Sequence, residues 1–254
     1  MSDPRISVIM PGCGVGELVV KVLDRLFESI RLSCEVLVIV DSLADPTAEV
    51  AERYALTEPR LSCLVSTYGE GPANAIRFGV DAARGRTIVV TAADGSDDSR
   101  QIDALAKLVE RGVVVAAASR YMSGGQQVGG HVVKGFLSRS AGRSLHALAR
   151  TGTRDATNSF KAYSASFARS VGIDSMNGSE IGIELTAKAK RLRLPVAEIP
   201  TTWLDRPSDE ANFKTIHWIP GYLRWYRFSF GPRLTVEQVR ARSSIRVRVG
   251  ARQT

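Results

Sequence analysis

The chain has 254 residues, of which 44% are hydrophobic and 24% charged, and its formal net charge is +8. These values are ordinary for a globular protein, and the apolar runs are far shorter than the roughly 20 residues of a membrane-spanning helix. Residues 1–5 also lack the plan of a secretory signal peptide, so we expect a cytoplasmic protein. The unpaired spacing of Cys13, Cys34 and Cys63 argues against zinc or a disulfide framework. The basic charge indicates either a partner that carries phosphates or merely a solubilising surface.

The first 120 residues alternate between short apolar runs and helical segments. Strands are expected at residues 6–10, 35–40, 61–65, 87–91 and 113–118. Helices are expected at residues 17–30, 47–54, 74–83 and 101–110. This alternation predicts repeated βαβ units and a parallel sheet that is buried on both faces. Ligands bind beyond the carboxyl ends of such strands, so residues 11–17, 41–45 and 94–98 are the candidate site segments.

Beyond residue 120 the pattern changes. Residues 122–130 are rich in glycine and glutamine and predict a mobile loop. Further elements are expected as helices at 132–150 and 180–191 and strands at 160–163 and 195–199. We expect one domain over residues 1–230, with a nucleotide-binding half at 1–120 and an acceptor half at 121–230. Residues 231–254 are expected to form a basic C-terminal tail.

Two C-terminal segments each allow two interpretations. Residues 218–230 are rich in aromatic side chains, with Arg224 and Arg227 among them, and would either lie in a membrane interface or pack in the core. Residues 245–249 alternate arginine with apolar residues, which is typical of an edge strand or of a basic arm attracted to anionic lipid. Both segments allow a peripheral contact with a membrane.

Acidic residues follow two of the expected strands. They are Asp41 and Asp45, then Asp94, Asp97 and Asp98. Carboxylates at the mouth of a parallel sheet suit a hard divalent cation, which can neutralise a diphosphate leaving group. The alternative is that they form turns and cap helices, which is as plausible for Asp45 and Asp98 and less so for Asp94. The glycines at 12, 14 and 16 do not fit the G-x-G-x-x-G dinucleotide fingerprint.

Seven segments, taken in order, resemble the motifs of a known enzyme family. They are Ile6–Pro11, Glu35–Thr47, Gly71–Gly79, Thr91–Asp98, Ser119–Gly125, Asp155–Tyr163 and, at the acceptor-side end, Glu180 and Glu184 with Pro200–Arg206. The chain resembles a family-2 glycosyltransferase, close to the dolichol-phosphate mannose synthase branch. The resemblance implies a GT-A-type, Rossmann-like α/β fold with a mostly parallel sheet. It also implies transfer of a hexose, with inversion, from GDP-mannose or a UDP-hexose to a polyprenyl phosphate or a glycan. The implied cofactor is Mg²⁺ or Mn²⁺, and the implied location is the inner face of a membrane.

The resemblance assigns roles to individual residues. The nucleotide sugar would contact residues at four strand and helix ends, namely Pro11, Asp41, Gly71, Asn74, Ala93 and Asp94. Asp94 and Ser96 would hold the metal. The catalytic group would include a base, Asp97 or Asp98, which is needed only if the acceptor is a hydroxyl. It would also include Arg120 and Arg206, which would bind phosphate. The acceptor side would include Glu180, Trp203, Asp205 and Lys214.

The sequence also departs from the family pattern. The early loop lacks the family's Tyr, Asn and Glu, Val40 replaces the first Asp of the Asp-Asp pair, and Ala92 replaces the first Asp of D-x-D. Fewer anionic ligands should weaken metal binding. An alternative is therefore a catalytically impaired relative that binds a nucleotide sugar or a protein partner. A nucleic-acid partner is not expected, because no known binding motif accompanies the charge.

Overall fold

The computed structural model describes residues 3–12, 14–130, 132–176, 178, 180–204 and 211–244, without the side chains of residues 132–134 and 211–218. The strands are β1 (Ile6–Pro11), β2 (Cys34–Val40), β3 (Leu61–Val65), β4 (Thr87–Val90), β5 (Val115–Ser119), β6 (Gln126–Val128), β7 (Lys161–Ser164), β8 (Val196–Pro200) and β9 (Thr202–Leu204). The α-helices are α1 (Leu18–Ser29), α2 (Pro46–Ala55), α3 (Pro72–Ala82), α4 (Ile102–Glu110), α5 (Val132–Ser144), α6 (Ala165–Val171), α7 (Ile181–Leu192), α8 (Ala211–Phe228) and α9 (Val236–Ser243). A 3-10 turn (Ser99–Gln101) precedes α4, and a π-helix (Leu145–Ala149) follows α5.

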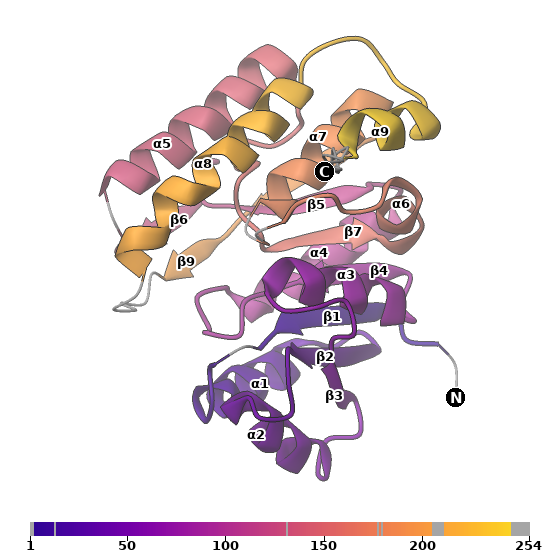
Figure 1. Cartoon of the computed structure of the whole chain (residues 1–254), viewed down its shortest axis with the longest axis vertical. Coiled ribbons are helices and arrows are strands. Elements are labelled where there is room, and N and C mark those ends of the chain that lie inside the picture. Colours follow the sequence, from indigo (N-terminus) through magenta and orange to yellow (C-terminus); the bar gives the residue numbers. More distant parts are fainter. Residues whose placement is uncertain are drawn as a thin grey trace, which may run out of the picture.

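The centre of the molecule is a seven-stranded sheet in the order β3-β2-β1-β4-β7-β5-β8 (Figure 1). The strand pairs β1–β2, β1–β4, β2–β3 and β5–β8 are parallel, as predicted. The expected strand near residues 160–163 is instead antiparallel to both of its neighbours, β4 and β5. The fold is therefore the predicted α/β arrangement with a mostly parallel sheet, and β7 inserts in the opposite direction between β4 and β5.

Alternate residues of each strand face opposite sides of the sheet, and two apolar cores result. In β1, Val8 and Met10 join one core with α1, α2 and α4, whereas Ile9 joins a second core with α3, α6 and α7. Strands β1, β2, β4 and β5 are buried on both faces, which explains why they read as continuous apolar runs. A third, smaller cluster around Trp225 connects the π-helix, α7 and α8.

Beyond residue 120 one expectation is corrected and the structure adds detail to two others. The segment predicted to be a mobile loop contains β6, which pairs with β9 in a separate two-stranded sheet. The helix expected over 132–150 changes at residue 145 into the π-helix and ends at Arg150 in the left-handed conformation. The segment predicted to be a basic tail contains α9, whose Val239 is fully buried in the second core.

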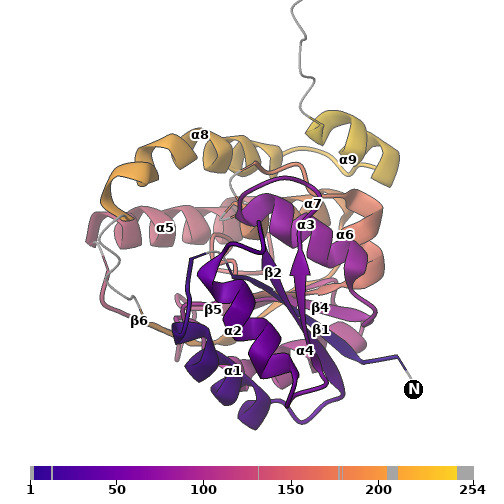
Figure 2. The same ribbon diagram turned by 60° about the horizontal axis from the view of Figure 1, so that its bottom comes forward.

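Helices α5 and α8 run side by side at one end of the molecule, away from β3 (Figures 1 and 2). A hydrogen bond of 3.0 Å joins the hydroxyls of Ser144 and Tyr226 between them. Among the helices in the described ranges, none is both long and apolar enough to cross a membrane. The expected edge strand or basic arm at 245–249 lies outside the described residues.

Candidate active site at the carboxyl edge of the sheet

The parallel strands bring the predicted site residues to one edge. Strand register pairs Pro11 with Ile39, and Ile9 with Val90, so β1, β2 and β4 end close together. Asp41 follows β2, and the acidic segment 94–98 follows β4, as the sequence predicted. Residues 119–121, at the end of β5, complete this edge, separated from β4 by β7.

Asp41 connects the end of β2 to the start of α3. Its Oδ2 accepts a hydrogen bond of 2.9 Å from the backbone N–H of Gly71, the residue before α3. Its Oδ1 is buried and has no hydrogen-bond partner in the described part of the chain. A buried carboxylate oxygen without a partner is costly, so this atom suits a hydroxyl or amide donor supplied by a ligand.

Asn74 and Asp45, by contrast, are engaged within the protein. The Asn74 amide donates to the carbonyl of Glu70 and accepts from Arg77 at 2.6 Å. Asp45 caps α2 through Thr47 N–H and also accepts from Gly14 N–H, both at 2.8 Å. The capping alternative for Asp45 thus describes its geometry, and Asn74 shapes the start of α3.

The segment after β4 folds back on itself through its carboxylates. Asp94 Oδ1 accepts from the N–H of Ser96 at 2.8 Å, and the Ser96 and Ala93 side chains are buried. Asp97 Oδ2 accepts from the N–H of Ala92 at 2.9 Å and from the hydroxyl of Thr91 at 3.1 Å. Burial raises the pKa of Asp97 to about 6, and the charge of Asp94 adds to this, although these hydrogen bonds oppose it.

Asp98 is the cap of the 3-10 turn that leads into α4. Its carboxylate accepts from Arg100 N–H and forms an ion pair with the exposed Arg100 guanidinium at 2.8 Å. These contacts lower the pKa of Asp98, with the side-chain hydrogen bond from Arg100 as the largest cause. Asp98 therefore has the geometry of a cap. Within the described ranges, no three acidic, histidine or cysteine side chains are grouped to hold a metal.

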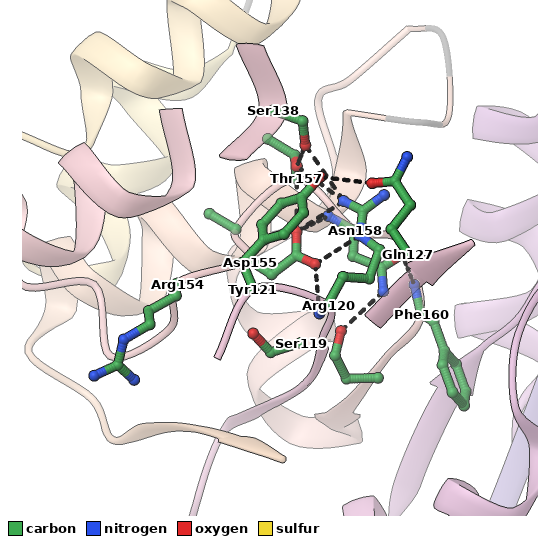
Figure 3. A network of polar contacts seen from close by, with 12 residues as sticks. Ser119, Arg120, Tyr121, Gln127, Ser138, Arg154, Asp155, Thr157, Asn158 and Phe160 are labelled. Atoms are coloured by element: carbon green, nitrogen blue, oxygen red, sulfur yellow. Dashed lines mark hydrogen bonds and ion pairs between the residues drawn. The ribbon is translucent and has the colours of Figure 1, made fainter. Parts of the chain in front are cut away.

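Arg120 lies at the centre of a buried polar network at the end of β5 (Figure 3). Its Nε and Nη2 donate to the two oxygens of Asp155 at 2.7 and 2.9 Å, and its own N–H donates to the same carboxylate. Nη2 also contacts the hydroxyls of Ser138 on α5 and Thr157, each at 3.3 Å. Asp155 is fully buried and the Arg120 side chain is 10% exposed.

This ion pair changes the titration of both groups. Burial alone would raise the pKa of Asp155, but the hydrogen bonds and charge of Arg120 outweigh it and lower that pKa. For Arg120, burial acts to lower the pKa, but the hydrogen bonds and the negative charge of Asp155 outweigh burial, so the pKa of Arg120 is raised. The sequence placed Arg120 at a phosphate but gave Asp155 no role. The only signal was that Asp155 begins one of the family-like segments.

Lys161 on β7 is a second buried cation near this network. Its Nζ donates to the carbonyls of Ala156 and Asn158, and its side chain is fully buried. Burial lowers its pKa to about 7, although the nearby Asp155 carboxylate opposes the shift. Sequence reasoning did not single out this residue.

The acceptor-side residues are only partly described. The ring of Trp203 lies 5.5 Å from the Arg120 guanidinium carbon, beside the network. Glu180 Oε1 accepts from Met176 N–H, while its Oε2 is buried without a partner in the described part and faces Gly221 of α8. Asp205 and Arg206, and the side chain of Lys214, lie outside the described residues.

The chain matches known proteins in both sequence and structure. The model of the family described as glycosyl transferase family 2 matches residues 7–172. An undecaprenyl-phosphate mannosyltransferase of Micrococcus luteus is 26% identical over 82% of this chain and 87% of its own length. A polyprenol monophosphomannose synthase of Mycolicibacterium smegmatis is 26% identical over 84% of this chain and 86% of its own.

Solved structures extend the comparison to the fold. A mannosyltransferase of Pyrobaculum calidifontis, in complex with GDP-Man and Mn²⁺, covers 96% of this chain and 69% of its own, at 17% identity and a TM-score of 0.62. A glucosyl-3-phosphoglycerate synthase of Mycobacterium tuberculosis, with Mn²⁺, UDP and glucosyl-3-phosphoglycerate, covers 88% of this chain and 80% of its own, at 16% identity and a TM-score of 0.64. The predicted GT-A-type fold is confirmed.

Proposed function

This chain belongs to glycosyl transferase family 2, and from that premise we propose that it transfers a hexose from a nucleotide-diphosphate sugar to a polyprenyl phosphate, with inversion. The observation that carries the proposal is the sheet edge that holds Asp41 and Asp94 beside the Arg120 network. The two similar mannosyl-transferring relatives, each matched over more than four fifths of this chain, support mannose as the sugar and a polyprenyl phosphate as the acceptor.

The donor would occupy the ends of β1, β2 and β4. The unpartnered Oδ1 of Asp41 would accept a hydrogen bond from a ribose hydroxyl or from the base. Pro11, Gly71 and Ala93 would form the walls, since each lies at a strand or helix end on this edge. The backbone of Gly71, at φ +96, is in a conformation that glycine adopts without strain.

The residues present fit a divalent cation that is bound mainly by the donor's diphosphate. Asp94 would be its protein carboxylate. Among the described contacts, Ser96 N–H uses only Oδ1 of Asp94, which leaves Oδ2 for the cation. The Ser96 hydroxyl would be a weaker ligand. Such a cation would neutralise charge on the departing diphosphate. With Ala92 in place of a second carboxylate, we expect weak affinity in the absence of nucleotide.

A phosphate acceptor fits the state of the candidate bases. In the proposed transfer, an acceptor phosphate oxygen forms a bond to the anomeric carbon, the bond from that carbon to the diphosphate breaks, and the nucleoside diphosphate leaves with the electron pair. An anionic phosphate oxygen needs no base, whereas a hydroxyl does. Asp97 and Asp98 are both engaged in hydrogen bonds within their own loop. Arg120, with Arg206 and Lys214, would attract the acceptor phosphate.

A lipid acceptor also fits the exposed face of α5 and α8. Phe136 and Leu137 on α5 are 68% and 56% exposed, and Ile219 and Leu223 on α8 are 44% and 47% exposed. Trp225, in the predicted aromatic segment, is instead fully buried. Apolar side chains on two adjacent helices, beside arginines, are typical of a surface that contacts a membrane interface. We propose that this face contacts the membrane.

The decisive experiment separates donor binding from transfer. We expect calorimetric titration to detect binding of GDP or UDP that strengthens with Mn²⁺ or Mg²⁺, and a radiolabelled donor to label a polyprenyl phosphate. Nucleotide binding without transfer to either a polyprenyl phosphate or a glycan would support the impaired relative instead. Failure of both nucleotides to bind would contradict the proposal.

The membrane contact has its own test. Phe136→Ser/Leu137→Ser should reduce sedimentation with anionic vesicles, while Leu56→Ser, at an exposed leucine just beyond α2, should not. Equal sedimentation of all three proteins would contradict the proposed membrane face.

A further inference from the structure

A basic cavity lies next to the Arg120 network but is separate from it. It has a volume of about 440 Å³ and is lined by Tyr121, Met122, Ser123, Arg143, His146 and Arg154. Among the described residues, none that lines it is acidic, and Arg120 is not part of its wall. Figure 3 shows Arg154 directed away from the Arg120 network. Tyr121 contributes to both, because its ring lies 4.7 Å from the Arg120 guanidinium carbon.

The local backbone brings the basic residues together. Gly142 on α5 lies so close to the chain at Arg154 that a Cβ there would overlap the Arg154 carbonyl oxygen. This close approach places Arg143, the next residue on α5, near Arg154. The helix then changes to π geometry over Leu145–Ala149, and His146, which lines the cavity, lies within this turn. Single π turns within helices are frequently associated with functional sites.

The three basic side chains are prepared for an anion in different ways. The Nδ1 atom of His146 is buried and has no hydrogen-bond partner in the part of the chain that the structure describes. Glu198 holds Arg154 in place through two hydrogen bonds. The Arg154 Nη1 donates to Oε1 of Glu198 at 2.6 Å, and the Arg154 backbone N–H donates to Oε2 at 2.7 Å. The Arg154 side chain nevertheless remains 45% exposed. Arg143 is exposed and forms no ion pair with a described carboxylate.

We propose that this cavity is a second anion site, which binds a phosphate monoester. Two guanidinium groups and an imidazole supply donors from several directions, and such donors match the oxygens of a tetrahedral phosphate. Glu198 balances the charge of Arg154, whereas the charge of Arg143 has no described carboxylate beside it and would be balanced by an anionic ligand. The proposal does not depend on the transfer reaction, because none of its three basic residues is assigned to the donor or to the acceptor phosphate.

The phosphate could belong to a soluble metabolite or to a lipid headgroup. Leu148, on the same π-helix as His146, is 71% exposed, which places an apolar side chain close to the cavity. The two sources share their chemistry at the site and differ in whether a membrane is needed. The experiment therefore has a soluble arm and a vesicle arm.

The soluble arm is a calorimetric titration of the full chain with glycerol 3-phosphate, repeated with saturating nucleoside diphosphate and metal. We expect saturable binding that the nucleotide does not displace. Arg143→Gln/His146→Leu should weaken it at least about tenfold, since hydrogen bonds to a charged ligand are lost. Arg150→Gln is the matched control, because Arg150 is exposed at the end of the π-helix and outside the cavity wall; it should bind like the wild type.

The vesicle arm compares phosphatidylcholine vesicles with and without phosphatidic acid. Binding that requires phosphatidic acid and is lost in Arg143→Gln/His146→Leu, with no saturable binding of glycerol 3-phosphate, would assign the site to a lipid headgroup. Absence of saturable binding in both arms, or equal binding by the double variant with its circular dichroism unchanged, would overturn the proposal. Neither result depends on transfer activity, so the donor and acceptor proposals would stand or fall separately.

Discussion

The carboxylates of the two halves of the molecule differ in what they bind. Between residues 41 and 98, most of them accept hydrogen bonds from backbone N–H groups of nearby loops, as Asp41 does from Gly71 and Asp94 does from Ser96. Beyond residue 150, most of the described carboxylates form ion pairs, as Asp155 does with Arg120 and Glu184 does with Lys188, although Glu180 accepts from a backbone N–H. A loop carboxylate that uses one oxygen in this way keeps the other for a ligand. The first half is therefore the better place for a donor site, and the second half is stabilised by its ion pairs.

The largest effect should come from breaking the buried pair of the second half. Asp155→Asn leaves the charge of Arg120 buried without its counter-ion, so we expect it to lower the free energy of unfolding by about 3–5 kcal/mol. Urea denaturation would measure this. Glu110→Gln is the matched control, because Arg5 contacts Glu110 with the same two-bond geometry at an exposed site, where a pair contributes about 0–1 kcal/mol.

A double variant tests the reason for that loss. Arg120→Met/Asp155→Leu removes both charges and should be less destabilised than Asp155→Asn alone. If Asp155→Asn proved no more costly than Glu110→Gln, the pair would have to be solvated, and the contrast between the two halves would fail.

The next largest effect should appear in the pH dependence of stability. The pKa of Lys161 falls from an ordinary value of 10.5 to about 7 in the folded protein because of burial. Between these two values the unfolded chain binds more protons, so this group makes stability increase as the pH rises. Above pH 7, the free energy of unfolding of the wild type should therefore rise relative to that of Lys161→Met. The rise should be up to about 1.4 kcal/mol per pH unit.

Urea denaturation at several pH values from neutral to mildly alkaline would measure that difference. Using the difference between two proteins removes the contributions of thiols and other groups that both contain. A difference that stays constant with pH would mean that Lys161 is charged in the folded state.

The N-terminal half of the fold could be predicted from its sequence, and the rest less well. β3 begins and ends at the predicted residues, because apolar runs and helical periodicity are local signals. β6 and β9 were missed as a pair, since each has three residues and depends on a partner about 75 residues away. The direction of β7 and the short helix α6 likewise depend on tertiary packing.

The candidate site was predictable in position but less so in role. The rule that ligands bind at the carboxyl ends of parallel strands located Asp41 and Asp94 correctly at one edge. It gave no means to separate a ligand-binding carboxylate from a cap, as Asp45 illustrates. It also gave no means to find Asp155, because a counter-ion 35 residues from Arg120 is defined only by the fold.

The loss of a carboxylate at Ala92 offers a moderate effect in the first half. Ala92→Asp should raise the affinity for Mn²⁺ in the presence of the bound nucleotide on the order of tenfold, because a second anionic ligand joins Asp94. Ala92→Asn, which adds a similar volume without charge, is the control. Calorimetric titration with Mn²⁺ would measure both. No gain in Ala92→Asp would contradict the assignment of Asp94 to the metal.

The smallest effect should come from Asp98, whose role distinguishes a cap from a catalytic base. Asparagine retains a side-chain oxygen for the N–H of Arg100, so Asp98→Asn should preserve the cap and lose only an ion pair with an exposed arginine. Its stability should change by less than about 1 kcal/mol. Its rate of transfer to a polyprenyl phosphate should remain that of the wild type, whereas removal of a general base would reduce the rate by about 10²–10⁴-fold.

Asp98→Ala completes the comparison, because it removes the cap as well and should cost about 1 kcal/mol more than Asp98→Asn. A large loss of rate in Asp98→Asn without loss of stability would show that a first-half carboxylate bonded within its own loop still acts on the acceptor. That result would contradict the proposal that the acceptor phosphate attacks without a base.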